Sequence, residues 1–159
     1  MNKEELIQKL KSTASKLKVH YGVGTSEFED VLKKCIIKIP TSIFSRELGV
    51  LETVCRYLKD ELDLNFIDIS ILMHRDERSI WSSYNNSLKK RGKLDVKETE
   101  ILIPLEVFRD RKFSSLESVV GYLKGEGLSL HEIGVILKRD DRTIWTVYDR
   151  FKKKRWKEL

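Results

Sequence analysis

Hydrophobic residues in the middle of this chain recur three and four positions apart, the spacing that places them on one face of an α-helix. Two stripes share this pattern: Leu51, Val54, Cys55 and Leu58 in the first, and Leu116, Val119, Val120 and Leu123 in the second. Ser114 or Ser115 is a natural N-cap for the second stripe. Gly125 and Gly127 would close it. The pattern predicts two amphipathic helices, each with one buried face.

Each of these helices is followed by two further helical patterns. The shorter one opens on a polar residue, Asn65 or Ser129, with an acidic residue three positions later. Its predicted buried positions are Ile69, Leu72 and Met73, and correspondingly Ile133, Ile136 and Leu137. The next helix opens on Asp76 or Asp140, a residue type favoured at an N-cap. Its predicted core positions are Ile80 and Tyr84, and correspondingly Ile144 and Tyr148.

Two features of these helices call for a packing explanation. A small residue, Ser70 or Gly134, lies in the middle of the shorter helix, where glycine costs about 1 kcal/mol relative to alanine. We expect another helix to approach closely at this point. Trp81 and Trp145 directly follow the core isoleucines of the third helix. We expect both to pack, either under an extended segment or where the two halves meet, rather than to stack on bases.

A proline-containing segment precedes each group of helices. Residues 36–44 and 101–108 both contain the pattern Ile-Pro-x-x-(Ile or Val)-Phe. Proline cannot donate a hydrogen bond to a sheet, so it is excluded from a central strand. We therefore predict an extended strap or an edge strand at each site. The phenylalanines that end the pattern, Phe44 and Phe108, are expected to fill the cores of their own repeats.

The two halves of the chain repeat one another at a fixed offset. Residues 64–84 and 128–148 align without gaps and are identical at 8 of 21 positions, whereas unrelated sequences would match at roughly one or two. The offset is longer than a solenoid repeat and is typical of a duplicated small domain. We expect an all-α fold in which a three-helix unit is duplicated, each copy preceded by an extended Ile-Pro strap. The predicted parts are an N-terminal helical region at 1–35, repeat 1 at 36–93 and repeat 2 at 94–159.

The N-terminal region is expected to add two helices. Residues 3–18 place four apolar side chains on one face and lysines around the other; the four are Leu6, Leu10, Ala14 and Leu17. Such a helix either docks on the rest of the fold or pairs with a second copy of the chain. Ser26 and Glu29 form a capping box. The short helix that it opens has one shared face, made of Phe28, Val31, Leu32 and Cys35.

Charge, hydropathy and cysteine content limit the classes of binding partner but do not identify one. The 159 residues carry a formal net charge of +6, with a pI near 9.2, which permits nucleic-acid binding but does not require it. No apolar run is long enough to span a bilayer, so we expect a soluble, cytoplasmic protein without a membrane partner. Cys35 and Cys55 have no CxxC spacing and no nearby histidine pair, so no metal site is expected. Cys55 aligns with Val120 and is predicted to be a core residue.

Two short helices joined by a tight turn, with a small residue in the first and a capped, basic second, form the helix-turn-helix pattern. The second copy reads Leu128-Ser-x-x-Glu-Ile-Gly-x-x-Leu137-x-Arg-x-x-Arg-Thr-Ile144. This run resembles the DNA-binding helix-turn-helix of region 4 of bacterial sigma factors, and of Trp-repressor and DnaA-type domains. The resemblance covers about 25 residues of each copy. The first copy departs from it, because Asn65-Phe-Ile-Asp lacks the usual Leu-Ser start and Ser70 replaces glycine or alanine.

The resemblance implies that each three-helix unit is a helix-turn-helix unit whose third helix enters the DNA major groove. The residues that would face DNA are Arg139, Asp141, Arg142, Thr143 and Thr146 in the second copy, and Arg75, Glu77, Arg78, Ser79 and Ser82 in the first. The basic residues that would then bind phosphate are Arg150, Lys152, Lys153 and Lys154, and Lys89, Lys90 and Arg91. Two alternatives stay open: the acids and arginines form a self-paired surface network, or the C-terminal lysines are a solvated tail.

The sequence contains no enzyme signature. Its three histidines share no motif, and it has neither a glycine-rich phosphate loop nor a nucleophile elbow. We expect no catalysis and no cofactor. The leading hypothesis is a transcription regulator or chromosome-associated factor that binds double-stranded DNA, either at specific sequences or generally, as a monomeric pseudo-dimer or as a homodimer. Such a protein would be associated with the nucleoid. The rival is an interaction scaffold that docks on RNA polymerase or another protein, and structured RNA is the last-ranked partner.

Overall fold

The computed structural model describes residues 37–157, together with residues 4–5, 8–9, 12–13, 15–16 and 19. The scattered N-terminal residues are all helical, in agreement with the helix predicted over 3–18. The predicted apolar face of that helix and the predicted capping box at Ser26 lie outside the described residues. By contacts the chain divides into two compact units, Met1–Ile37 and Lys38–Leu159.

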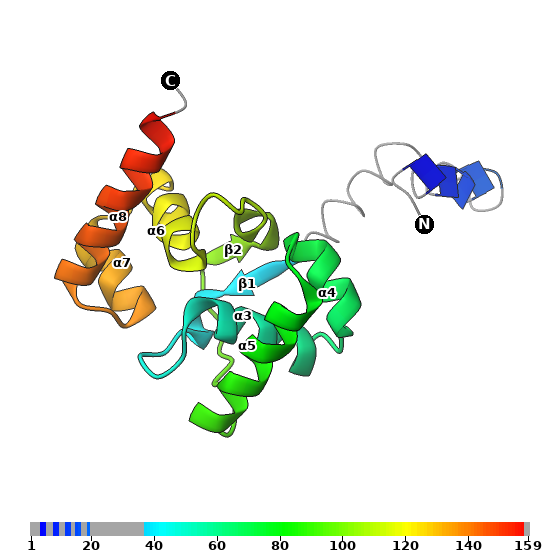
Figure 1. Cartoon of the computed structure of the whole chain (residues 1–159), viewed down its shortest axis with the longest axis horizontal. Helices are drawn as coiled ribbons and strands as arrows, with labels where there is room; N and C mark the ends of the chain where they lie inside the picture. The colour runs from blue at the N-terminus through cyan, green and yellow to red at the C-terminus, as the bar shows by residue number, and fades with distance from the viewer. Residues whose placement is uncertain are drawn as a thin grey trace. The chain divides into compact units, whose positions relative to one another are not determined.

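The second unit is mostly helical, as predicted, with one small antiparallel sheet in its described part (Figure 1). We call residues 38–93 the first half and residues 94–157 the second half. The first half contains β1 (Lys38–Pro40), the 3-10 helix η1 (Thr41–Ile43), α3 (Val50–Asp60), α4 (Phe66–Met73) and α5 (Glu77–Lys90). The second half contains β2 (Leu102–Pro104), the 3-10 helix η2 (Leu105–Phe108), α6 (Ser115–Gly125), α7 (Leu130–Leu137) and α8 (Asp141–Trp156).

The elements of the two halves follow the same order at a nearly constant separation along the chain. The separation between the starts of α4 and α7 equals that between α5 and α8. The separation between the starts of α3 and α6 is longer by a single position. This difference falls in the loop between the first and second helices of each half. Loops are the segments in which a length difference costs least, because few packed side chains depend on them.

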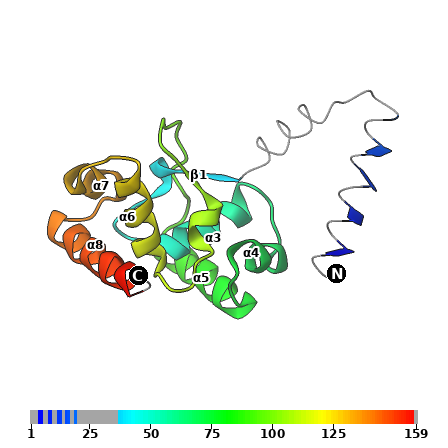
Figure 2. The same ribbon diagram turned by 90° about the horizontal axis from the view of Figure 1, so that it is seen from above.

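Strands β1 and β2 pair with each other and join the two halves. They contain the Ile-Pro segments, and Ile39 lies opposite Ile103 in the antiparallel ladder. Figure 2 shows the β1 segment between the α3–α5 helices and the α6–α8 helices. Within the described residues each strand has one neighbour, so its proline meets no second strand there to which it would have to donate a hydrogen bond.

The core consists largely of the predicted residues. Val54, Cys55 and Leu58 of α3 are fully buried, and so are their counterparts Val119, Val120 and Leu123 of α6. Phe44 and Phe108 are also buried, at 2% and 0% exposure. Burial raises the pKa of the Cys55 thiol to about 12, as expected for a core residue without a chemical role. The predicted core residues that lie at its edge are half-buried: Leu51, Leu72, Tyr84, Leu116, Ile136 and Tyr148.

The prediction that Trp81 and Trp145 pack inside the fold is wrong. Their side chains are 55% and 62% exposed. The preceding residues, Ile80 and Ile144, are fully buried, and each step along a helix rotates the side chain by about 100°. A small three-helix unit covers only one stripe of its third helix, so the residue after the core isoleucine turns outward to the surface.

At Gly134 the following turn comes close to α7. A Cβ atom added there would lie 2.9 Å from the carbonyl oxygen of Arg139 and 3.0 Å from Oδ1 of Asp141. The predicted close approach is therefore present, but it involves the turn and the first residue of α8 rather than the body of another helix. The carbonyl is part of the backbone, so a larger residue at Gly134 would require the turn of the second half to shift.

We expect Gly134→Ala to lower the free energy of unfolding by about 1–3 kcal/mol through this clash, although alanine favours a helix by about 1 kcal/mol. Urea denaturation would measure the change. Ser70→Ala is the matched control, because the first half already carries a Cβ at this position and should lose less than about 0.5 kcal/mol. Equal stability of Gly134→Ala and the original chain would contradict the clash.

Candidate nucleic-acid interface

The turn between the second and third helices has the same geometry in both halves. The residues that directly follow α4 and α7, His74 and Lys138, both adopt the left-handed conformation, with φ of 50° and 53°. Asp76 and Asp140 then cap the next helix, as predicted, by accepting hydrogen bonds from the third backbone N–H after them. In each half, the second helix is therefore joined to a capped third helix (α5 or α8) by a short turn of the same conformation.

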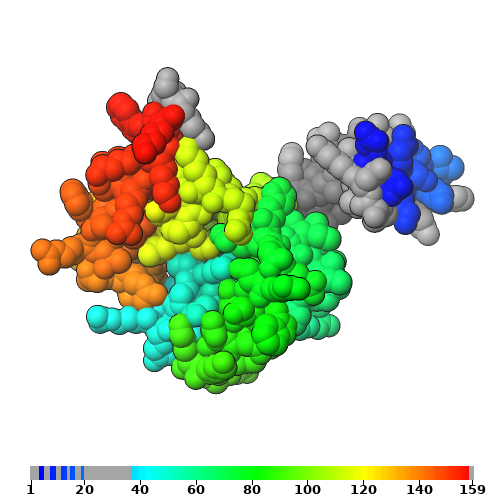
Figure 3. Space-filling view, viewed as in Figure 1, coloured from blue at the N-terminus to red at the C-terminus, as the bar shows by residue number. Residues whose placement is uncertain are grey.

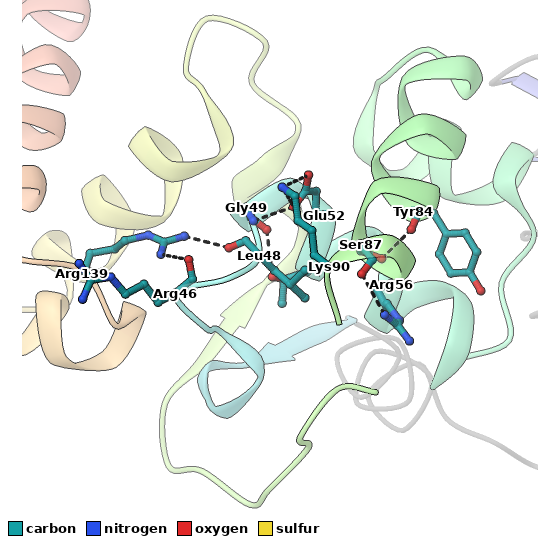
Figure 4. A network of polar contacts seen from close by, with 10 residues as sticks. Arg46, Leu48, Gly49, Glu52, Arg56, Tyr84, Ser87, Lys90 and Arg139 are labelled. Carbon is teal, nitrogen blue, oxygen red and sulfur yellow. Dashed lines mark hydrogen bonds and ion pairs between the residues drawn. The ribbon is translucent and has the colours of Figure 1, made fainter. Parts of the chain in front are cut away.

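The arginines within these turns contact the opposite half of the molecule. The guanidinium of Arg139 donates hydrogen bonds of 2.8 Å to the carbonyl oxygens of Arg46 and Leu48 (Figure 4). The guanidinium of Arg75 donates to the hydroxyl of Ser115 at 3.1 Å. Burial, and then the charge of Arg111, lower the pKa of Arg75. Both arginines, predicted to face DNA, thus join the two halves.

Several of the predicted phosphate-binding side chains are engaged within the chain. Lys90 pairs with Glu52 at 2.8 Å (Figure 4), and its counterpart Lys154 pairs with Glu117 at 2.6 Å. Burial alone would raise the pKa of Glu117, but hydrogen bonds from Lys154 and the Ser114 backbone lower it. These two lysines tie the third helix to the first helix of their own half, so Lys154 does not belong to a solvated C-terminal tail.

The remaining predicted basic residues differ in their contacts. Lys153 pairs with Asp149 at 2.7 Å, and the ammonium of Lys152 lies 5.2 Å from the ring centre of Tyr148. The side chain of Arg91 donates to the carbonyl of Lys93 at 3.1 Å and lies 3.8 Å from Glu47. Lys89 and Arg150 are exposed.

The hydroxyl-bearing candidates also split into engaged and exposed groups. Thr143 donates to the carboxylate of its own cap, Asp140, at 2.8 Å. Thr146 donates to the carbonyl of Arg142 at 2.9 Å, which leaves its oxygen able to accept. Ser79 donates its backbone N–H to the cap of α5 at 3.2 Å. Ser82 is exposed on α5.

The predicted DNA-facing residues that are neither buried nor paired lie at the start of each third helix, at matching positions in α5 and α8. Arg78 of α5 and Arg142 of α8 are exposed, and their guanidinium groups form no hydrogen bond or ion pair with residues of the described chain. Trp81 and Trp145 follow three positions later on the same faces. Figure 3 shows that α5 (green) and α8 (orange to red) reach the surface of the molecule. We call these residues, with Ser82 and the half-buried Thr146, the exposed stripes.

Acidic residues flank both stripes, and in the second half the acid has a partner. Asp141 lies 2.9 Å from Nδ1 of His131, and both side chains are exposed. The first half has Glu77 and Ile67 at the equivalent positions, so it lacks this pair. The two halves therefore differ in that an imidazole stands beside the acid of the second half only.

We expect the imidazole of His131 to titrate above its usual pKa, because its hydrogen bond to Asp141, and then the charge of that carboxylate, favour the protonated ring. A raised pKa in the folded state means that the pair stabilises the fold fully below the unfolded pKa. That contribution disappears as the pH rises through the folded pKa. An NMR titration of the His131 ring would measure the shift, and Asp141→Asn should abolish it. The same titration curve in both proteins would contradict the pairing.

The surface position of the two tryptophans was not predicted from the sequence. A tryptophan at the same position in both halves indicated that Trp81 and Trp145 have a shared role. It did not indicate whether their side chains are buried or exposed. Their helical phase was the usable signal, since they stand one position away from the buried stripe. Ile71 and Val135, at equivalent positions on α4 and α7, are likewise 64% and 65% exposed.

No group of three or more histidine, cysteine, aspartate or glutamate side chains among the described residues is placed to hold a metal ion. No helix in that part of the chain is long and apolar enough to cross a membrane. Comparison of the chain with protein-family models, with curated proteins and with solved structures found no match.

Proposed function

We propose that this chain is an internally duplicated, tandem helix-turn-helix protein that binds double-stranded DNA and regulates transcription, without catalysis or a cofactor. The observation that carries the proposal is the pair of exposed stripes. At the same position in both halves, an exposed arginine with no partner in the described chain stands beside an exposed tryptophan on a capped helix.

The chemistry of the stripes suits the edges of base pairs in a major groove. Arginine donates two parallel hydrogen bonds to guanine, serine and threonine bind several bases, and apolar side chains contact the methyl group of thymine. The start of a third helix is where such contacts are made in helix-turn-helix proteins. Arg78 and Arg142 take the specific role in the proposal, while Arg75 and Arg139 hold the halves together.

Phosphate contacts are assigned to the cations that remain exposed. Lys89 of α5 and Arg150 and Lys152 of α8 extend beyond the stripes, and the net charge of +6 favours attraction to a polyanion. Lys90 and Lys154 are left out of this group because they pair with the capping glutamates of α3 and α6. The resulting surface combines a few specific donors with a modest number of phosphate-binding charges.

The test is fluorescence anisotropy of a labelled random-sequence duplex, titrated with the protein at low and at physiological salt. Neutralising several phosphates releases counterions, so the affinity should fall steeply as salt increases. The same titration with a single-stranded oligonucleotide separates duplex binding from general attraction to nucleic acid. Absence of binding at low salt would refute the proposal.

A second candidate, a scaffold that docks on RNA polymerase or another protein, is favoured by one observation. Ile71 and Trp81 in the first half, and Val135 and Trp145 in the second, expose large apolar side chains on each helix-turn-helix. Exposed apolar groups of this kind mark protein contacts in many folds. A scaffold that uses these side chains to dock on a protein should bind the labelled duplex weakly or not at all, even at low salt, so the anisotropy titration separates the two candidates.

A further inference from the structure

We propose that the two helix-turn-helix units read an inverted repeat, with the same half-site on opposite DNA strands, rather than a direct repeat. This inference rests on the proposed function and specifies the class of DNA sequence bound. It follows from the way the two halves are joined, which determines the relative direction of their third helices.

The strand pairing relates the halves by an approximate twofold axis. Ile39 lies opposite Ile103, its counterpart in the second half. On either side of this pair the counterparts are exchanged, with Lys38 opposite Pro104 and Pro40 opposite Leu102. In an antiparallel ladder, a twofold axis passes between two directly opposed residues. That axis here exchanges the first half with the second at the point where they are joined.

The contacts outside the sheet are exchanged in the same way. Helix α4 of the first half packs on η2 of the second, and α7 of the second half packs on η1 of the first. Helices α3 and α6 also contact each other directly. Each half thus uses the same surface toward the other, which is the property of an isologous, twofold interface. A head-to-tail arrangement would require two different surfaces.

The arginines in the two turns, Arg75 and Arg139, make contacts that relate the helix-turn-helix units by the same approximate twofold axis. Arg75, in the turn after α4, binds Ser115 at the first turn of α6. Arg139, in the turn after α7, binds the carbonyl oxygen of Leu48 shortly before the start of α3. Each unit is therefore fixed, through its own turn, to the beginning of the first helix of the opposite half. The third helices begin shortly after these arginines, so they inherit the twofold relation.

Twofold-related recognition helices match DNA whose half-sites are related by the twofold axis of the duplex, and this gives a palindromic arrangement. The contents of the stripes make the two half-sites similar: Arg78, Trp81 and Ser82 correspond to Arg142, Trp145 and Thr146. One turn later the helices differ, with Asn85 in α5 and Asp149 in α8. The inverted repeat is expected to be imperfect at the bases that lie nearest to these two residues.

The experiment begins with selection of preferred sequences from a random duplex pool by the full chain. Three duplexes are then built from the selected half-site: an inverted repeat, a direct repeat and a single half-site, with centre-to-centre spacings varied around about 10 base pairs. We expect the best inverted repeat to bind at least about 10-fold more tightly than the best direct repeat or the single half-site. A preferred direct repeat, or equal affinity for the single half-site, would overturn the inference but not the proposed function. Failure to bind any duplex would overturn both.

Single substitutions give a second readout within the same experiment. Arg78→Ala and Arg142→Ala each remove one reading helix, so either should lower the affinity for the inverted repeat to that for the single half-site. Affinity for the single half-site should change less, because the other unit can still bind it. If only one of the two substitutions affects the inverted repeat, a single unit reads the DNA and the inference is wrong.

Discussion

Replacing Arg56 with alanine is expected to lower the free energy of unfolding by about 3 kcal/mol, since it removes a buried, hydrogen-bonded charge. The side chain is 3% exposed in α3. Its guanidinium donates to the carbonyl oxygens of Arg91 and Gly92, each at 2.5 Å, and to Asp60 at 3.0 Å. These bonds hold the residues that directly follow α5 against α3, and without them the carbonyl groups of Arg91 and Gly92 lose these partners.

Urea denaturation monitored by circular dichroism would measure the effect. Arg78→Ala is the matched control, because that arginine is exposed on α5 and its loss should change stability by less than about 0.5 kcal/mol. A loss for Arg56→Ala no larger than that of the control would mean that the buried hydrogen bonds contribute nothing net.

In the second half, the contact between the first and third helices that corresponds to Arg56 and Ser87 is made by a small residue on the first helix and a large one on the third. Gly121 stands where the first half has Arg56, and Phe151 stands where it has Ser87. A Cβ atom added at Gly121 would overlap with the ring of Phe151, so the ring occupies the space above the glycine. One half pairs a large polar residue with a small one, and the other pairs glycine with an aromatic ring.

This exchange provides a double-mutant cycle. Arg56→Gly and Ser87→Phe should each destabilise the first half, while the double variant should recover at least about 1 kcal/mol of the combined loss. The measurement is the same urea denaturation. If the two losses of stability are strictly additive, the glycine–phenylalanine pair does not pack in the first half as it does in the second. The surrounding residues, rather than the pair itself, would then determine the packing.

The parts of the fold that could be predicted from the sequence are those with local causes. The helices follow from the periodicity that buries Val54 and Leu58 and their counterparts. Their starts follow from caps: Ser114 and Ser129 each accept a hydrogen bond from the third residue of their own helix. Periodicity and caps depend on residues three or four positions apart. They can therefore be recognised in the sequence without knowing which helices and strands contact one another.

The features that could not be predicted depend on contacts between distant residues. Nothing near Arg139 indicates that its guanidinium will bind the carbonyl of Arg46, 93 positions earlier. The pairing of Ile39 with Ile103 likewise follows from the assembly of both halves. Of the predicted DNA-facing arginines, the structure leaves Arg78 and Arg142 exposed and engages the other two, although each pair recurs in both halves. Sequence repetition therefore identified the candidates but could not separate recognition from structural support.

The double substitution Arg78→Ala with Arg142→Ala is expected to weaken binding to the selected DNA site by about 100-fold or more, because a bidentate arginine–guanine contact discriminates by about 1–3 kcal/mol. Binding to random duplex should persist with nearly the same salt dependence, since phosphate-binding cations such as Lys89 and Arg150 remain. Anisotropy titrations on both duplexes measure the two affinities.

Arg139→Ala is the contrasting variant: it should lower the free energy of unfolding by about 1–3 kcal/mol and leave the specificity of the folded protein unchanged. The reverse pattern would assign recognition to the turn arginines and support to the exposed ones.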